Sequence, residues 1–463
     1  MSETQTIREE KMMTDPFETL KTSIVALSEA KKYATLRDIL TTMNASDIAS
    51  LFEDIPETYI PILFRLLPKE LAADTFVEME PETQELLIKG FSDRELKEVI
   101  DELYVDDAVD LVEEMPANVV TRILTQADLE KRRMINTILK YPEDSAGSIM
   151  TTEYVELRPH MTVADAIVHI RRCGIEKETI NTCYITSKNR TLIGVVTIRT
   201  LIMAKDEVTL EEIMDDNVLY VGTMDDQEEV AQKFSHYNLL AMPVVDQEER
   251  LVGIVTVDDV LDVIQEETTE DIEKMAAIVP QDKPYLKQST FELWKSRIPW
   301  LLLLMISATF TGMIITSFED ALSKFVVLTA YIPMLMDTGG NSGSQASVTV
   351  IRGISLNEVE FRDIFRVIWK EIRVALLCGL TLAACNFLKL SFFDGLAPMV
   401  ALTICLTLIV TIFCAKMVGC TLPLFAFKLG FDPAVMASPF ITTIVDAISL
   451  LVYFQFATHL LHL

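Results

Sequence analysis

Basic side chains are scarce in this sequence of 463 residues. Only 40 Lys and Arg stand against 69 Asp and Glu, so the formal net charge is −29. Proteins that bind nucleic acids need Lys and Arg to contact phosphate, so this balance argues against a nucleic-acid partner. It favours cations as partners, although a well-solvated acidic surface without bound ions has the same composition.

Cysteine and histidine are also sparse. The seven Cys include no CxxC pair and five lie in apolar segments, so we expect reduced, packed thiols and neither a disulfide framework nor a zinc site. The five His form no Ser–His, Cys–His or HExxH-like arrangement, so no enzyme active site is predicted. The N-terminus lacks the apolar core of a signal peptide, so we expect the first 290 residues to stay where they are synthesised.

Long apolar runs are confined to the final third of the chain, where acids and bases balance. Residues 298–318 contain 21 uncharged residues in succession, enough to cross about 30 Å of hydrocarbon. Further candidates give a total of five predicted spans, and these lie at 325–350, 374–393, 396–424 and 433–458.

The loops between these spans predict their orientation. The connection between the second and third spans, 352–373, is rich in Lys and Arg, whereas that between the first and second carries only Lys324. By the positive-inside rule, the N-terminal region and the 352–373 loop are cytoplasmic. Five spans then place the C-terminus outside, as expected for a multi-pass protein of the cell (inner) membrane.

Residues 138–265 contain an internal repeat. TLIGVVTIRTLI, starting at Thr191, aligns with RLVGIVTVDDVL, starting at Arg250, at an offset of 59 residues. Each copy follows an apolar, strand-like run, so a tandem pair of α/β units is predicted.

The repeat resembles a CBS-domain pair, a regulatory module. In that family a Gly-apolar-apolar-Thr-x-x-acid motif holds adenosine nucleotides, and the second copy has it complete as Gly253, Thr256 and Asp259. The first copy has Arg199 followed by Thr200, where the acid would stand. The resemblance therefore implies an ATP-type ligand at the Arg199 and Thr256 positions, and a purely structural pair is the alternative.

The N-terminal region, residues 20–137, reads as helices with apolar positions at 3.6-residue spacing. The phrases DIASLFEDIP, DTFVEMEP and DAVDLVEEMP recur, which predicts an α-solenoid of stacked helices. Asp106 and Asp110 lie one helical turn apart, either as a solvated face or as a metal site.

An acidic segment separates the repeat from the membrane part. Its first half crowds Glu266, Glu267, Glu270, Asp271 and Glu273 into a short helical stretch, where like charges repel. Such a helix is either solvent-exposed or docked with a cation between the acids. We therefore divide the chain into 1–137, 138–265, 266–296 and 297–463.

The second predicted span has an unusual composition, YIPMLMDTGGNSGSQASVTVIRG. Backbone groups freed by its Pro and Gly residues must be satisfied inside protein or by water in a cavity. Small residues also serve tight helix packing, but packing does not explain Asn341 and Gln345, which lie four apart on one helical face. This favours a pathway lining.

Asp446 is a carboxylate within the fifth predicted span. Placing an acid at mid-bilayer costs about 2.5–3.5 kcal/mol or more, so such groups usually face a cavity, an ion or another charge. An ion pair with Lys416 is one explanation. The other is a hard cation bound by the oxygens of Asp446, Asn341, Gln345, Thr442 and Thr443, which suit magnesium or calcium.

The order of these segments, with PMLMDTGGNSGSQAS, GFDPAVMASPF and TTIVDAISLLVYF, resembles the MgtE family of magnesium channels over nearly the whole chain. The resemblance implies a homodimer with a pore on its two-fold axis, lined by the second and fifth spans, and a hydrated Mg²⁺ between two copies of Asp446. Gly339, Gly340, Asn341 and Gln345 match its pore-lining motif, with Thr442 nearby. Asp432 matches an aspartate near the cytoplasmic gate.

The resemblance also implies regulation by intracellular Mg²⁺. The 266–296 linker corresponds to a plug helix that closes the pore when Mg²⁺ bridges acids of the cytoplasmic domains. The implied sensor acids are Asp106, Asp110, Asp226, Glu228, Asp259, Glu267, Glu270 and Asp271. At low Mg²⁺ the acids repel, the domains spread and the pore opens.

The expected architecture is thus an N-terminal α-helical solenoid, an α/β tandem CBS pair, a plug helix and an all-α transmembrane domain of five helices. The expected partners are Mg²⁺ and other divalent cations, membrane lipid and a second copy of the chain. Four positions depart from the family pattern, and these are Lys416, Asp337, Asn238 and Thr200. A CBS-regulated membrane sensor without ion flux and a proton-coupled carrier using Asp446 are the alternatives.

Overall fold

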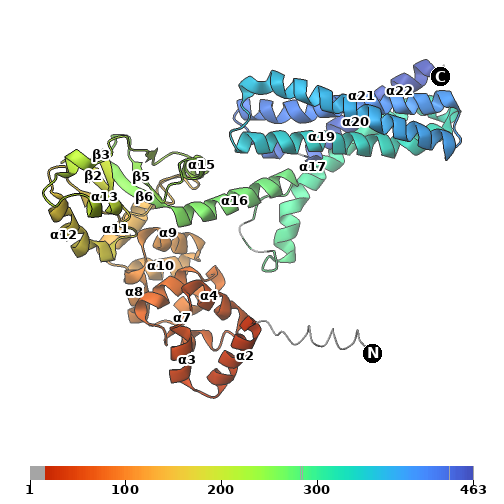
Figure 1. Ribbon diagram of the computed structural model, residues 1–463. Helices are drawn as coiled ribbons and strands as arrows, with labels where there is room; N and C mark the ends of the chain where they lie inside the picture. Colours follow the sequence, from red (N-terminus) through yellow and green to blue (C-terminus); the bar gives the residue numbers. More distant parts are fainter. Residues whose placement is uncertain (1–15, 282, 284, 437, 462–463) are drawn as a thin grey trace, which may run out of the picture. The chain divides into compact units, whose positions relative to one another are not determined.

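The computed structural model describes residues 16–281, 283, 285–436 and 438–461 (Figure 1). Its contacts divide the chain into two compact units, Met1–Val263 and Ile264–Leu463. Each unit is described by itself.

The first unit begins with a series of short helices that fill residues 16–138. They are α2 (Pro16–Glu29), α3 (Tyr33–Leu40), α4 (Ala45–Asp54), α5 (Ile60–Phe64), α6 (Lys69–Val77), α7 (Pro81–Gly90), α8 (Asp93–Glu102), α9 (Val105–Glu114), α10 (Ala117–Gln126) and α11 (Leu129–Ile138). Helix α4 packs on α6, α6 on α8, α8 on α10, and α9 on α11. This packing of alternate helices is the stacking expected of an α-solenoid.

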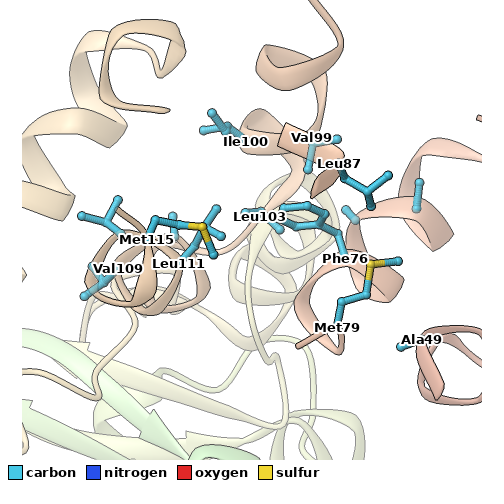
Figure 2. Close-up of a cluster of buried hydrophobic side chains, with 14 of the residues drawn as sticks. Ala49, Phe76, Met79, Leu87, Val99, Ile100, Leu103, Val109, Leu111 and Met115 are labelled. Atoms are coloured by element: carbon cyan, nitrogen blue, oxygen red, sulfur yellow. The ribbon is translucent and has the colours of Figure 1, made fainter. Parts of the chain in front are cut away.

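Local sequence explains where these helices begin and which face they bury. Ser92 starts α8 with a capping box, in which its hydroxyl accepts from the Glu95 N–H and the Glu95 carboxylate accepts from the Ser92 N–H. Helix α9 buries Val105, Val109 and Val112 on one face. Figure 2 shows such apolar side chains meeting in the core, with Phe76 and Leu103 near its centre.

The predicted repeat is confirmed as two small sheets of the same topology. The first contains β1 (Glu156–Leu157), β2 (Thr182–Thr186) and β3 (Leu192–Thr197), and the second contains β4 (Val221–Gly222), β5 (Ala241–Val245) and β6 (Leu251–Thr256). In each sheet the first two strands pair in parallel and the last two pair antiparallel. The accompanying helices are α12 (Val163–Cys173), α13 (Ile198–Met203), α14 (Leu210–Ile213) and α15 (Gln227–Tyr237).

The helical region and the second copy of the repeat share one hydrophobic core. Val244 and Val255 of the second sheet belong to the same buried cluster as Leu111 and Ile123 of the helices. The backbone also joins them, because Ala146 N–H donates to the Asp225 carbonyl at 2.7 Å. The first unit therefore holds acids from α9 and from the second copy in fixed relation to each other.

Helix α16 (Val257–Met275) begins directly after β6, and the two units divide within it. The sequence predicted a separate linker starting at residue 266. The helix instead starts inside the second copy of the repeat and ends at Met275, and α17 (Thr290–Ser317) begins eight residues before the predicted span.

The second unit is otherwise a bundle of long helices (Figure 1). After α17 come α18 (Glu319–Lys324), α19 (Ile332–Ser355), α20 (Ile364–Phe392), α21 (Pro398–Lys428) and α22 (Ser438–Leu460). Within the described residues, four stretches are helical, long and apolar enough to cross a membrane, at Thr290–Ser317, Phe361–Phe392, Pro398–Lys428 and Pro433–Leu460. Helix α19 is not among them but packs closely against α21 and α22. A total of five spans, with α19 as the second, stays a prediction.

Candidate ion pathway and metal sites

Helix α19 carries a polar stripe along one face. Asp337, Asn341 and Gln345 follow one another at four-residue spacing and are all exposed on the isolated chain. The Asn341 side-chain amide donates to Asp337 Oδ1 at 3.1 Å. The side chains at 337 and 341 thus form one polar group on a helix whose opposite face is buried.

The glycines of α19 lie on that buried face. A Cβ on Gly339 would meet Thr411 Cγ2 at 2.6 Å, and one on Gly343 would meet Ile441 Cγ2 at 2.9 Å. Gly340 packs against Thr442, whose Cγ2 would lie 3.0 Å from an added Cβ. Helix α19 runs unbroken through the motif, so these glycines allow close packing with α21 and α22. A further pathway-lining role for Gly339 and Gly340 stays a prediction.

Helix α22 supplies the second set of predicted pathway residues. Asp446 is half-buried, and the Asp337 carboxylate of α19 acts on it electrostatically. Thr442 and Thr443 both donate to the Pro439 carbonyl, at 2.9 Å and 3.1 Å. Helices α19 and α22 pack against each other, so Asp337 lies near Asp446 and is added to the candidate site that the sequence assigned mainly to Asp446.

Lys416 lies apart from that site. Its Nζ is 3.3 Å from Glu371 Oε2, and the two side chains are 5% and 13% exposed. The pairing with Asp446 that the sequence left open is therefore wrong. Sequence reasoning missed Glu371 because it placed this residue in a loop, whereas α20 begins at Ile364 and brings it against α21.

The predicted gate residue Asp432 lies just before the short 3₁₀ helix η4 (Pro433–Met436). Its Oδ1 accepts from the Ala434 N–H at 2.7 Å, and its Oδ2 is 2.7 Å from Lys274 Nζ. Lys274 thus links Asp432 to α16.

The predicted sensor acids of α16 lie close to Asp432 and α19. Glu270 pairs with the same Lys274. Asp271 accepts a 3.4 Å hydrogen bond from Ser355 at the end of α19. Glu267 lies one turn earlier on α16 and is half-buried.

Carboxylates gather in the first unit, and one of them, Asp106, is buried. Asp106, which is 6% exposed, and Asp110 both come from α9, and each is acted on by Asp259 at the start of α16. Burial, reinforced by Asp259, raises the pKa of Asp106 well above its usual value. Asp110 reaches the surface, but the surrounding protein removes part of its hydration and Asp259 lies near, so its pKa is also raised, to about 8. The three acids predicted separately along the sequence therefore form one cluster.

Two further acids belong to this cluster and were missed by sequence reasoning. Burial raises the pKa of Asp107 to about 6, and burial with the charge of Asp107 raises that of Glu178 to about 8. Asp107 could have been found beside Asp106 in the DDAVD motif. Glu178 lies in a loop of the first copy of the repeat, so only tertiary structure brings it here.

The carboxylates of this cluster are not arranged as the direct ligands of a metal ion. Among the described residues, no group of three or more His, Cys, Asp or Glu side chains is arranged to hold a metal ion directly. Magnesium keeps several of its waters and is often bound through only one or two carboxylates, so outer-shell contacts suit this cluster. Protons are the alternative neutralising ions, as the raised pKa values indicate.

The other predicted sensor residues have local structural roles. Asp226 caps α15 and accepts from the Glu228 N–H at 2.8 Å, while Glu228 accepts from the Gln232 amide at 3.3 Å. Asn238 ends α15 with φ of 52°, a left-handed conformation that Asn tolerates better than most residues.

The predicted nucleotide motif has the same geometry in both copies. Thr256 donates to Asp259 Oδ2 at 2.6 Å, and in the first copy Thr197 and Thr200 are joined by their hydroxyls at 2.9 Å. Arg199 and Thr200 line an open hollow of about 370 Å³ together with Met203 and Ala204. The first copy thus has a concave surface and a basic group, but no acid at position 200.

Comparison with known proteins identifies the family. Residues 332–456 match the MgtE model, described as a divalent cation transporter. Residues 43–144 match the MgtE intracellular N domain, and residues 146–207 and 210–266 match the CBS domain. The chain belongs to the MgtE family.

Relatives of the MgtE family match this chain over most of its length. The magnesium transporter MgtE of Thermus thermophilus is 36% identical over 440 residues, covering 94% of this chain and 97% of the relative. That of Bacillus subtilis is 32% identical, covering 95% and 97%. These matches confirm the predicted MgtE resemblance, and together with the apolar helices they make the chain a multi-pass membrane protein.

A solved structure of part of a magnesium transporter supports the fold of the first unit. The crystal structure of the soluble part of a magnesium transporter aligns with a TM-score of 0.51 and 28% identity, covering 54% of this chain and 99% of that one. The helical N-terminal domain and the CBS pair are therefore confirmed.

Proposed function

We propose that this chain forms a Mg²⁺-selective channel, opened and closed by intracellular Mg²⁺. The observation that carries the proposal is the placement of Asp337, Asn341 and Asp446 on the neighbouring helices α19 and α22, within a unit of long apolar helices. Carboxylates in such a setting usually face an ion or a water-filled cavity. The full-length relatives are named as magnesium transporters, which supports the choice of ion.

A second copy of the chain would complete the pathway. Asp337, Asn341 and Gln345 are exposed on one protomer, and such polar groups are costly to leave facing lipid. A two-fold axis beside α19 and α22 would cover them and bring two copies of Asp446 together. Two carboxylates with amide and hydroxyl groups around them suit a cation that keeps its hydration shell. Pairing of Lys416 with Glu371 supports this, because that ammonium does not oppose a cation at Asp446.

Gating would use the acidic cluster of the first unit and the acids of α16. Asp106, Asp110 and Asp259 repel one another when ionised, so a state that places Mg²⁺ among them gains binding energy that an opened state lacks. Asp226, Glu228, Glu267, Glu270 and Asp271 are the remaining proposed sensor acids. We place all of them in the cytoplasm, with lipid around the membrane unit and the C-terminus outside. An adenosine nucleotide at the CBS pair stays a prediction.

The proposal is tested by Mg²⁺ uptake into liposomes that contain purified protein and a Mg²⁺-sensitive dye. We expect Asp446→Asn to reduce uptake at least tenfold, because the pathway loses its central charge. Asp394→Asn is the matched control, since Asp394 is an acid of the same unit that pairs with Tyr331 and Lys389. Equal uptake by wild type and Asp446→Asn would remove the pore assignment, and no uptake by either would favour a sensor without flux.

The same liposomes separate a channel from a carrier. A channel passes Mg²⁺ in proportion to its electrochemical gradient, whereas a proton-coupled carrier needs a pH gradient. We expect uptake to be unchanged when the pH gradient is collapsed at constant external pH. Loss of uptake in that condition would instead assign Asp446 to proton coupling.

A further inference from the structure

Helix α16 is strongly acidic and has one base. Eight Asp and Glu residues lie between Val257 and Met275, and Lys274 in the last turn is the only Lys or Arg. A cation at a helix C-terminus is favoured by the helix dipole. This position alone does not explain where its side chain points.

The ammonium of Lys274 joins two elements of the second unit. Its Nζ lies 2.7 Å from Glu270 Oε1 on its own helix and 2.7 Å from Asp432 Oδ2, just before η4. Asp432 is itself fixed, because its other oxygen accepts from the Ala434 N–H at 2.7 Å. The lysine side chain is 23% exposed, so its two contacts are partly shielded from water.

Other contacts place the same turn of α16 on the same surface. Met275 packs against Ile351 of α19 and Ala434 of η4, both 1% exposed. The turn that ends α16 is closed by the Ile278 N–H, which donates to the Glu273 carbonyl at 2.9 Å. The end of α16 is therefore docked by an apolar contact and by a two-carboxylate contact that needs a positive charge.

We propose that Lys274 is a positioning residue, whose tethered ammonium takes the place of a metal ion between Glu270 and Asp432 and docks the end of α16 without any divalent cation. This inference rests on the proposed gating role of α16. Part of the docking of α16 in the closed pore is then independent of metal, because Lys274 already joins Glu270 to Asp432. Mg²⁺ bound at the other acids of α16 completes this docking and does not start it. Burial acts to lower the pKa of Lys274, but its hydrogen bonds to Asp432 and Glu270 raise it overall, so the charge is present at neutral pH.

The test is amide hydrogen exchange of residues 268–278 in the full-length protein in nanodiscs, with EDTA present. We expect wild type and Lys274→Arg to exchange slowly, and Lys274→Met to exchange about tenfold faster because the charged contact is gone. Lys283→Met is the matched control, since Lys283 pairs with Glu292 at an exposed site. Equal protection in wild type and Lys274→Met would overturn the inference.

Asp432→Asn separates bridging from a local effect on the helix. If Lys274 acts through Asp432, the single variants and the double variant exchange at the same increased rate, whereas additive increases contradict bridging. Should Lys274→Met fail to fold, seen as loss of protection in α20 and α21, Asp432→Asn alone serves as the test variant, and wild-type protection in it overturns the inference.

Added MgCl₂ tests whether the ammonium substitutes for a metal ion. Mg²⁺ at millimolar concentration is expected to restore protection to Lys274→Met and to change wild type less. If Mg²⁺ does not restore protection to Lys274→Met, the ammonium does not take the place of a metal ion. Hydrogen exchange in EDTA does not depend on ion transport. The flux assay can therefore contradict the proposed channel while the exchange data support the role of Lys274. Equally, the exchange data can contradict that role while the flux assay supports the channel.

Discussion

Lys416 and Glu371 show how a single contact changes the interpretation of a membrane site. A lysine inside a membrane helix would oppose cation passage if it faced the pathway. Its Nζ instead lies 3.3 Å from Glu371 on the neighbouring helix α20, and both side chains are nearly excluded from solvent. The pair is therefore a property of the α20 and α21 interface.

This pairing predicts a large loss of stability when one partner is removed. Glu371→Gln leaves the Lys416 ammonium without a countercharge, which costs about 3–5 kcal/mol for a buried pair. The loss is measured as a lowered unfolding temperature of the purified protein in detergent. The double variant Lys416→Met with Glu371→Leu, which removes both charges, should recover most of it. A double variant as unstable as Glu371→Gln would show that the charges are not paired with each other.

The glycines of the membrane unit predict a second residue-scale effect. A Cβ on Gly419 of α21 would collide with the backbone of Gly343 on α19, and backbone cannot move aside easily. Gly419→Ala should therefore destabilise the protein by about 1–3 kcal/mol, measured as a lower unfolding temperature in detergent. Gly312→Ala on α17 is the control, since nothing lies within 4 Å of its added Cβ. Equal effects of the two substitutions would contradict close packing at Gly343.

At the scale of elements, sequence reasoning succeeded where composition is decisive. Apolar length predicted the apolar parts of α17, α20, α21 and α22, and the 59-residue repeat predicted the two matching sheets. The polar first turns of α17 and α20 were not predicted, because they extend beyond the apolar runs. Sequence reasoning did not show that one helix, α16, runs from the second CBS copy into the acidic segment, across the division drawn at residue 266. That division of the chain stays a prediction. A change in charge content does not mark the end of a helix, because the backbone hydrogen bonds of a helix do not depend on the charges of its side chains.

Helix α19 is the element on which the predicted span count depends. Its Gly, Ser, Thr and Asn content keeps its hydropathy low, although its glycine face packs against α21 and α22. Sequence could identify Asn341 and Gln345 as one polar face. It could not tell that Gly339 and Gly343 serve packing, since that depends on which helices lie opposite.

The span count is tested with reporters fused to the C-terminus. Five spans and a cytoplasmic N-terminus predict that a C-terminal alkaline phosphatase is active and a C-terminal fluorescent protein is dark in bacteria. A fusion after residue 289, before α17, should give the opposite pattern and serves as the control. A bright fluorescent protein on the full-length chain would instead indicate an even number of spans.

At the scale of the whole molecule, the crowded acids of the first unit couple folding to pH and to metal. Asp107, Asp110, Asp259 and Glu178 have pKa values of about 6 to 8 in the folded chain, whereas unfolded carboxylates titrate near 4. Because the folded pKa values are raised, the folded state binds more protons. Stability contributed by these groups is full below about pH 4 and is lost as pH rises through 6 to 8.

This coupling predicts that Mg²⁺ stabilises the protein more at pH 8 than at pH 5.5. At the lower pH protons already neutralise the cluster, so there is less repulsion for Mg²⁺ to relieve. The measurement is the Mg²⁺-induced rise in unfolding temperature of the full chain at the two pH values.

A variant of the cluster tests the same coupling. Asp110→Asn should raise the unfolding temperature in EDTA at pH 8 and reduce its further rise on addition of Mg²⁺. Asp38→Asn, at an exposed acid of α3, should change neither, and equal Mg²⁺ responses at both pH values would exclude the cluster as the coupling site.

The central claim is that two copies of Asp446 hold a hydrated divalent cation on a two-fold axis. The most direct measurement is anomalous X-ray diffraction from crystals of the full-length protein grown with Mn²⁺, because Mn²⁺ gives a strong anomalous signal and Mg²⁺ does not. We predict a peak between the two Asp446 side chains, at a distance that leaves room for water, and its loss in Asp446→Asn. A peak that persists in Asp446→Asn, or a membrane unit with no peak near Asp446, would contradict the claim.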